Sequence, residues 1–296
     1  MGSTRKGNFL FRLSFLLIAA TLFVIASLPV FADSFPRAQA LYQGAHYKAS
    51  IALLKHHKGD PAAMALLGRD YYMLGDFEKA SGYLKKALAA RPDNSDYADW
   101  LGRCYGKRAQ TSNFLQAPLL ASKARKAFER AVQLNPKNTY ALSDLFDYYL
   151  NAPGILGGGY DKAASVAEKM SAIDPAEGYF EQAELSQKQE QFRLAENDLK
   201  KSVALGPNQP GHLIALAKLL AKEGLTGESD ATFQKAQKAA PNAPRIWFAY
   251  ADTLIQEKRN LKQAKALLEK YLNGPITAND PPRQEALNLL KRAGGI

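Results

Sequence analysis

The sequence has a single cysteine, Cys104, among its 296 residues. One cysteine excludes an intrachain disulfide, so the fold depends on packing and hydrogen bonds alone. Runs of valine, isoleucine and threonine, which favour strands, are nearly absent, whereas alanine, leucine and lysine are abundant. The composition therefore predicts a helical protein.

Motifs for catalysis are missing as well. The sequence contains no Gly-x-Ser-x-Gly, no His-Glu-x-x-His and no paired cysteines. His56 and His57 are adjacent, so on a helix their rings diverge by about 100° and do not form a metal-binding i, i+4 pair. Cys104 lies beside Tyr105 with no base nearby, which indicates an inert thiol. We therefore expect no catalytic residue, no metal site and no cofactor, in a protein that is not an enzyme.

Acidic residues are fewer than basic ones, and the formal net charge is +11. Residues 1–32 contain three basic residues and no acid, so their removal would leave +8. The basic residues of the remainder are scattered, without a basic block or a nucleic-acid motif, which makes nucleic acid an unlikely partner. Acidic proteins, cell-wall polymers and anionic lipid remain as partners that suit this charge.

Long apolar runs are confined to the N-terminus. Residues 1–12 are basic, residues 13–28 carry no charge, and Pro29 is followed by small residues at positions 30 and 32. This order is typical of a secretory signal peptide and predicts a cut after Ala32. The protein is then exported, either periplasmic or secreted. The alternative is an uncleaved inner-membrane anchor formed by residues 13–31.

The rest of the chain carries an internal repeat. The clearest unit begins at Pro61 and has apolar or small residues at fixed spacing: Met64, Leu67, Gly68, Tyr71, Ala80, Leu84, Ala87 and Pro92. The first four of these lie at i, i+3, i+4 and i+7, which is one face of a helix. Small residues at positions 68, 80 and 87 predict a close approach between that helix and a second one.

The same frame recurs up to about residue 271, and residues 36–61 hold a degenerate first unit. These residues resemble the tetratricopeptide repeat family, whose helix–turn–helix consensus has a period of 34 residues. The resemblance implies an all-α, right-handed superhelical solenoid. We expect a signal peptide at 1–32, about seven repeats in 33–280 and a capping helix in 281–296. The small and large residues along which the helices pack form the seam of a unit. Since each unit buries its seam only against adjacent copies, we expect an open curved rod.

Two units are longer than the family period because of insertions between their first and second helices. The first insertion lies within residues 106–123 and contains Phe114, Leu115, Leu119 and Leu120. These apolar residues either lengthen a helix and tuck against the neighbouring turn or form a loop that contacts a partner.

The second insertion, residues 151–162, contains Gly154 and the run Gly157–Gly159. A glycine-rich turn before a helix can bind phosphate, but no strand precedes this one and the lysine-serine/threonine pair of nucleotide loops is missing. We therefore predict a shaped turn, with Asp161 capping the following helix.

The resemblance also implies a binding site, because the concave wall of such arrays takes extended or helical peptides. Carried onto this chain, the groove residues are Arg69, Tyr72, Met73, Asp99, Arg103, Lys107, Ser143, Asp147, Phe180, Glu184, Lys188, Ile214, Lys218, Lys222, Phe248 and Asp252. Their mixed charges and aromatic rings favour a protein or peptide partner. The asparagines of the family's carboxylate clamp are missing, so a C-terminal Glu-Glu-Val-Asp tail is not implied.

These features predict an exported scaffold or adaptor that binds proteins or peptides in its groove, in envelope assembly or secretion. The alternative function is docking on an anionic cell-wall polymer or membrane surface through the basic charge.

Overall fold

The computed structural model describes residues 28–57 and 59–294, with side chains from Ser34 onward. Within these ranges every regular element is helical, so the predicted all-α fold class is confirmed. The elements are α2 (Leu28–Gln43), α3 (Tyr47–Leu54), α4 (Pro61–Met73), α5 (Phe77–Ala90), α6 (Ser95–Thr111), α7 (Ala117–Leu134), α8 (Thr139–Asn151), the 3₁₀ turn η1 (Gly154–Leu156), α9 (Tyr160–Ser171), α10 (Pro175–Lys188), α11 (Phe192–Leu205), α12 (Pro210–Lys222), α13 (Thr226–Ala239), α14 (Pro244–Gln256), α15 (Leu261–Asn273) and α16 (Arg283–Gly294).

The expected leader lies outside the described residues up to position 27. The described part of helix α2 runs from Leu28 to Gln43, with Pro36 in its interior. The expected cut after Ala32 falls within this helix. In the described ranges, no helix combines the length and apolarity needed to cross a bilayer.

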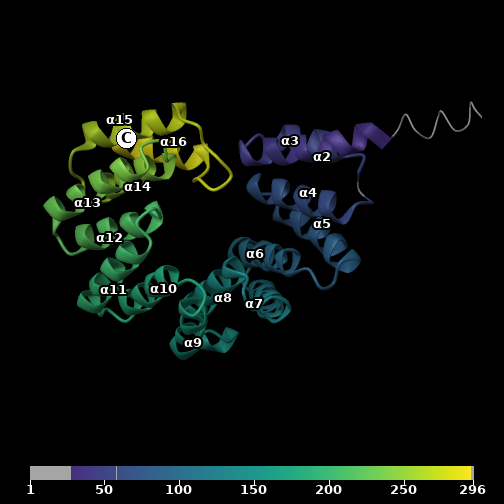
Figure 1. Cartoon of the computed structure of the whole chain (residues 1–296), viewed down its shortest axis with the longest axis horizontal. Helices are drawn as coiled ribbons and strands as arrows, with labels where there is room; N and C mark the ends of the chain where they lie inside the picture. Colours follow the sequence, from purple (N-terminus) through teal and green to yellow (C-terminus); the bar gives the residue numbers. More distant parts are fainter. Residues whose placement is uncertain (1–27, 58, 295–296) are drawn as a thin grey trace, which may run out of the picture.

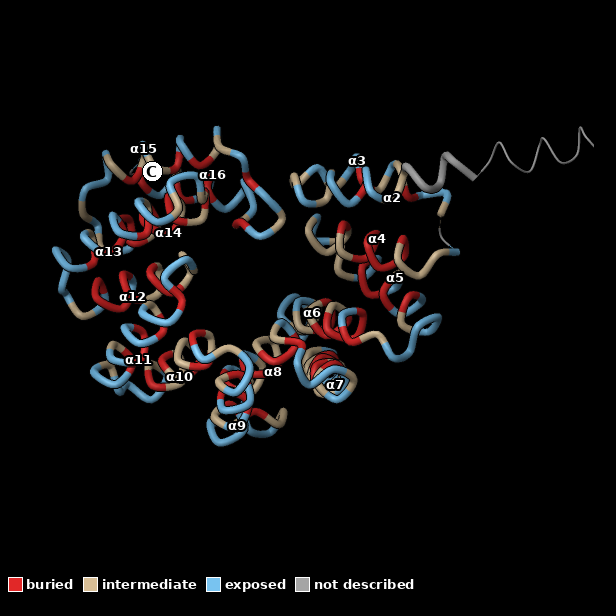
Figure 2. The backbone as a smooth tube through the Cα atoms, viewed as in Figure 1, coloured by how far each residue is buried: buried red, intermediate tan, exposed pale blue. Residues whose placement is uncertain are grey.

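The helices form consecutive pairs, each of which stacks on the next (Figure 1). Seven pairs, from α2/α3 to α14/α15, are followed by the single helix α16 within the described part. The even-numbered helices from α4 to α14 lie on the inside of the curve and their partners lie on the outside (Figure 1). Buried residues follow the interfaces between helices, and exposed residues cover the outer helices (Figure 2). The core is therefore a continuous ribbon along the array.

Small residues at the seam set how closely the two helices of a pair approach. A Cβ atom placed on Gly68 of α4 would lie 2.6 Å from Leu84 Cγ of α5, and one on Gly102 of α6 would lie 2.6 Å from the ring of Phe128 in α7. Both neighbours are buried, so they have little room to move. Glycine is required at these positions by the distance between the helices, as the repeat pattern predicts.

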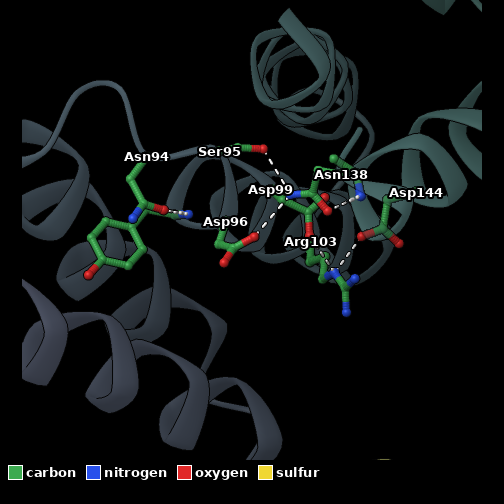
Figure 3. Close-up of polar contacts among 9 residues, drawn as sticks. Asn94, Ser95, Asp96, Asp99, Arg103, Asn138 and Asp144 are labelled. Atoms are coloured by element: carbon green, nitrogen blue, oxygen red, sulfur yellow. Dashed lines mark hydrogen bonds and ion pairs between the residues drawn. The ribbon is translucent and has the colours of Figure 1, made fainter. Parts of the chain in front are cut away.

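Polar side chains join one unit to the next at the helix N-termini. The Asn138 side chain accepts a hydrogen bond from the Ala141 amide and so caps α8. Its Nδ2 donates to Ser95 Oγ at 2.8 Å and to Asp96 Oδ1 at 2.9 Å at the start of α6 (Figure 3). Ser95 Oγ in turn donates to the carbonyl of Ala131 in α7. One capping residue therefore also fixes the orientation of its unit on the preceding one.

The first insertion extends both helices of its pair, to 17 residues in α6 and 18 in α7. Of its apolar residues only Leu120 is buried, whereas Phe114, Leu115 and Leu119 are exposed. The expectation that this apolar group tucks against the neighbouring turn is wrong for those three side chains. Phe114 and Leu115 lie in the turn between α6 and α7, and Leu119 and Leu120 lie in the first turn of α7, where only Leu120 is covered.

The second insertion forms a shaped turn, as predicted. After α8 the chain makes η1, and Gly157 and Gly159 then adopt φ values of +89° and +153°. A Cβ on Gly158 would lie 1.9 Å from the carbonyl oxygen of Ala152, so this position also requires glycine. The predicted cap is wrong: Gly159 is the N-cap of α9, and Asp161 lies inside the first turn because the helix begins at Tyr160.

The two ends of the array meet, which corrects the expectation of an open rod. The amide of Ala278, in the loop after α15, donates to the carbonyl of Gln43 at the end of α2 at 3.1 Å. Asp280 fixes the shape of this loop by accepting hydrogen bonds from the amide and hydroxyl of Thr277. The units therefore curve through one turn that closes on the first unit (Figure 1).

The seam geometry predicts opposite effects for two glycines of the same helix. Gly102→Ala places a methyl group against the buried Phe128 ring and should lower the free energy of unfolding by about 1–3 kcal/mol. Gly106→Ala meets no atom within 4 Å and should raise it by about 0.5–1 kcal/mol through helix propensity. Urea denaturation followed by circular dichroism measures both. Equal effects of the two substitutions would contradict the close approach of α6 and α7 at Gly102.

Candidate peptide-binding groove

The inner wall carries one row of charged side chains that passes through six helices. In each unit from α4 to α14, the residue directly after the seam position that Gly68 occupies in α4 is charged, and the row is Arg69, Arg103, Asp147, Glu184, Lys218 and Asp252. Because equivalent positions of stacked first helices lie on the same side of the array, these residues form a line along the concave wall. The line has basic, acidic and mixed sections.

The groove residues predicted from the sequence differ in how open they are. Those that are exposed are Lys107, Asp147, Lys188, Lys218 and Lys222. Those that are half-buried are Arg69, Tyr72, Met73, Arg103, Ser143, Phe180, Glu184, Ile214, Phe248 and Asp252. Asp99 is buried, with 2% of its surface exposed, so it is not a groove contact. The prediction that Asp99 belongs to the groove is therefore wrong.

Asp99 instead holds Arg103 in position. The Nε atom of Arg103 lies 3.1 Å from Asp99 Oδ2 and also pairs with Asp144 of the next unit (Figure 3). Burial and the charge of Asp144 raise the pKa of Asp99. Arg103 thus bridges α6 and α8, and removing it would leave two carboxylates close together on the wall.

An aromatic cluster lies beside this ion pair. The ring of Trp100 has the guanidinium carbons of Arg69 and Arg103 at 5.1 and 4.7 Å from its centroid, and the ring of Tyr72 packs edge-on against it at 5.4 Å. Sequence reasoning missed Trp100 because it precedes the seam residue Leu101 and belongs to neither the seam nor the groove positions. The signal that could have found it is the pair Arg69 and Arg103, which occupy equivalent positions of adjacent repeats. An aromatic ring placed between two such guanidinium groups is stabilised by both.

The two phenylalanines of the predicted groove pack against rings of other helices, Phe180 across two units and Phe248 within its own helix pair. Phe180 stacks on His212 with a centroid distance of 5.3 Å, and Phe248 lies 5.3 Å from the ring of Tyr271. His212 is itself buried, with its Nε2 atom 3.1 Å from Glu177 Oε2. These rings therefore serve mainly to join neighbouring helices.

Acidic side chains gather on α8 and α10, in the middle of the wall. They are Asp144, Asp147, Glu177, Glu181 and Glu184. Burial, together with neighbouring carboxylates, raises the pKa of Asp147 to about 6 and that of Glu184 to about 7. Asp147 is open to the groove, but the surrounding curve of protein reduces its hydration. A protein with a large positive net charge thus has an acidic section on its inner wall.

Glu181 is the most enclosed of these acids, with 1% of its surface exposed. Its Oε1 accepts a hydrogen bond from the hydroxyl of Ser143 at 2.9 Å, and its Oε2 has no hydrogen-bond partner among the described residues. Burial raises its pKa to about 8, and the charges of Glu177, Asp147 and Glu184 act in the same direction. Sequence reasoning missed Glu181 because its position faces the preceding unit, which becomes visible only once the units are stacked.

The far part of the wall is basic. Lys218 Nζ lies 3.3 Å from Asp252 Oδ2 of the next unit, and Lys222 Nζ lies 4.7 Å from the centroid of Phe192. The wall therefore changes from arginine and tryptophan through acids to lysine along the array, which agrees with the predicted mixed surface.

The described residues contain no group of three or more potential metal ligands. The thiol of Cys104 is fully buried, and burial raises its pKa to about 12, so it is not a nucleophile at neutral pH.

Comparisons with known proteins agree with this architecture. Sequence models of the tetratricopeptide repeat match residues 32–104 and 214–282, and the first match includes the degenerate first unit. Comparison with curated protein sequences gives no match.

Among solved structures, a tetratricopeptide repeat protein from Parabacteroides merdae is 13% identical, with a TM-score of 0.59 over 90% of this chain and 100% of that one. A thermophilic protein of the same class from Thermus thermophilus is 20% identical, with a TM-score of 0.54 over 64% of this chain and 98% of that one. These similarities show the fold.

The helix pairs, the seam and the inner wall define a helical-repeat solenoid. The chain is a tetratricopeptide repeat protein. Arrays of this family are, in general, non-catalytic scaffolds that bind proteins or peptides.

The buried Glu181 predicts a pH dependence of stability. Its pKa in the folded state, about 8, exceeds the ordinary value of 4.5, so the folded protein binds this proton more tightly than the unfolded chain does. Between these pH values, the free energy of unfolding therefore falls as pH rises. Glu181→Gln removes this contribution while keeping an acceptor for Ser143.

The free energy of unfolding is compared at pH 5 and pH 8. Over this rise in pH, Glu181→Gln should gain at least ~1.4 kcal/mol relative to the unmodified protein, which corresponds to one pKa unit. Urea unfolding at both pH values measures the gain, with Glu168→Gln on the outer helix α9 as the control. An identical pH dependence in all three proteins would show that Glu181 is not held in its protonated form.

Proposed function

We propose that this protein is an exported scaffold that binds segments of partner proteins along its inner wall, in assembly or secretion at the cell envelope. The observation that carries the proposal is the row of charged residues on α4 to α14, which runs without interruption along one face of the array. Many spaced polar and aromatic groups on one curved wall suit an extended polypeptide, which offers backbone and side-chain contacts along its length.

The acidic section distinguishes this function from docking on an anionic polymer. A polyanion would be repelled by Asp147 and Glu184, which are in the middle of the wall. Two variants with the same change in net charge separate the two functions. One reverses the inner wall, Asp147→Lys with Glu184→Lys, and the other reverses the outer helix α9, Asp161→Lys with Glu168→Lys.

The processed protein, immobilised, should capture partner proteins from an envelope extract, as quantified by mass spectrometry. The inner-wall variant should recover at least tenfold less of these partners, because its charge complementarity is lost. The outer variant should recover the same amount as the unmodified protein. If both variants instead retain more material, with a steep loss above physiological salt, the protein docks on a polyanion.

Export is part of this proposal, and residues 1–32 support it. The basic start, the uncharged stretch and the small residues at 30 and 32 match a cleavable leader. Protein recovered from its own cells should begin at Asp33 when its N-terminus is sequenced, and it should fractionate outside the inner membrane. An intact N-terminus in the membrane fraction would show an uncleaved anchor.

A further inference from the structure

The two insertions, which are separate in sequence, line one hollow in the structure. It lies where α6, α7, α8 and η1 meet and has a volume of about 770 Å³. Its apolar lining residues include Phe114, Ala121, Phe128, Tyr148, Pro153 and Leu156. A volume in the range of about 300–1,000 Å³ is typical of ligand sites. The regular repeat provides Phe128 and Tyr148, and the insertions add most of the remaining apolar wall.

The second insertion holds a defined shape at this hollow. The hydroxyl of Tyr148 donates to the carbonyl of Leu156 at 2.9 Å, and Lys162 Nζ donates to the carbonyl of Gly157 at 2.8 Å. The 3₁₀ turn also contacts α7. The wall is therefore formed in the free protein, which reduces the entropy lost when it is filled.

Apolar side chains are exposed to an unusual degree in the two insertions that border the hollow, and one of them, Phe114, lines it. Ile155, Phe114, Leu115 and Leu119 are 94%, 81%, 74% and 60% exposed. They are four of the five most exposed large apolar side chains in the described part of the chain, and all four belong to the insertions. Such a concentration of exposed apolar side chains in the two insertions marks a surface that another molecule covers.

A second hollow of about 360 Å³ lies next to the first along the wall. Asp147 and Asn151 line both, and the second is completed by Glu184, Lys188 and Lys222 among others. A small molecule would occupy one of these spaces, whereas an extended peptide segment can occupy both. The shared residues therefore favour a peptide.

The unpaired carboxylates of the second hollow favour a basic side chain. Asp147 and Glu184 line it together with Lys188 and Lys222, and no hydrogen bond or ion pair to the two carboxylates is found among the described residues. Burial and the charges of neighbouring carboxylates raise the pKa of both acids more than Lys188 lowers it, so a further cation placed between them would relieve unfavourable electrostatics.

We propose that the insertion-built hollow binds a large apolar side chain of a partner segment whose neighbouring lysine or arginine lies between Asp147 and Glu184. This inference rests on the proposed function, because it assigns the chemistry of the segment that the inner wall binds. Phe114 and the residues of η1 then supply the specificity that the regular repeat lacks.

A displayed library of random 12-residue peptides, selected on the processed protein, tests this inference. Selected sequences should share one aromatic or large aliphatic residue followed or preceded by lysine or arginine. Synthetic fluorescein-labelled versions are then titrated against four variants by fluorescence anisotropy. Phe114→Ala should weaken binding at least tenfold, and so should Asp147→Asn combined with Glu184→Gln. Tyr140→Ala, which removes an equally exposed ring outside the hollow, and Glu168→Gln should leave Kd unchanged.

Replacing the apolar residue of the peptide with alanine tests whether that residue occupies the hollow. That change should weaken binding to the unmodified protein at least tenfold and should have little further effect on Phe114→Ala, since both remove the same contact. Unchanged Kd values with Phe114→Ala, or selected sequences without an apolar residue, would overturn the inference.

The remaining outcomes distinguish this inference from the proposed function. Peptides that lose affinity for the Asp147 and Glu184 variant but not for Phe114→Ala would preserve groove binding and refute the apolar site. If no peptide is selected, or if none responds to either inner variant, both proposals fail. If Phe114→Ala instead abolishes binding to phosphatidylglycerol vesicles and leaves peptide binding intact, the exposed rim contacts a membrane and the inference is wrong.

Discussion

The close approach of two helices across a seam of small residues is the constraint on which the rest of the structure depends. At Gly102 there is no room for even one additional methyl group against Phe128, and Gly68 meets Leu84 in the same way. Each pair then buries its remaining apolar face only against the next pair, so packing fixes the orientation of every unit. Capping residues such as Asn138 strengthen that orientation by bonding across units.

Repetition of this geometry has two consequences for function. The curve brings Ala278 to Gln43, so the inner wall is enclosed by a closed turn. The seam also leaves one residue of each first helix on the inner wall, and its charge differs from unit to unit. The result is an acidic section inside a basic protein. The insertions between α6 and α7 and between α8 and α9 add apolar surface at the edge of that section.

The sequence predicts those parts of the molecule that depend on local spacing. The seam residues, the helix pairs and the glycine-rich turn follow from periodicity and backbone sterics, and they are as expected. The errors concern the burial of individual side chains, one helix cap and contacts between units. Asp99 has groove spacing yet is buried against Arg103, and Phe114 is apolar yet exposed. The meeting of the two ends depends on a small rotation summed over seven pairs, which no single repeat encodes. Trp100 and Glu181 became visible as parts of the wall only when neighbouring helices were in place.

The distance between the two ends of the array tests this account most directly, because it reports the accumulated geometry of every seam. Spin labels on cysteines introduced at the exposed residues Gln43 and Asn279 can be placed selectively, since Cys104 is buried. Electron–electron double resonance should show one short, narrow distance, as expected for a closed turn joined between Gln43 and Ala278. A broad distribution centred at long distances would show an open array and contradict the account.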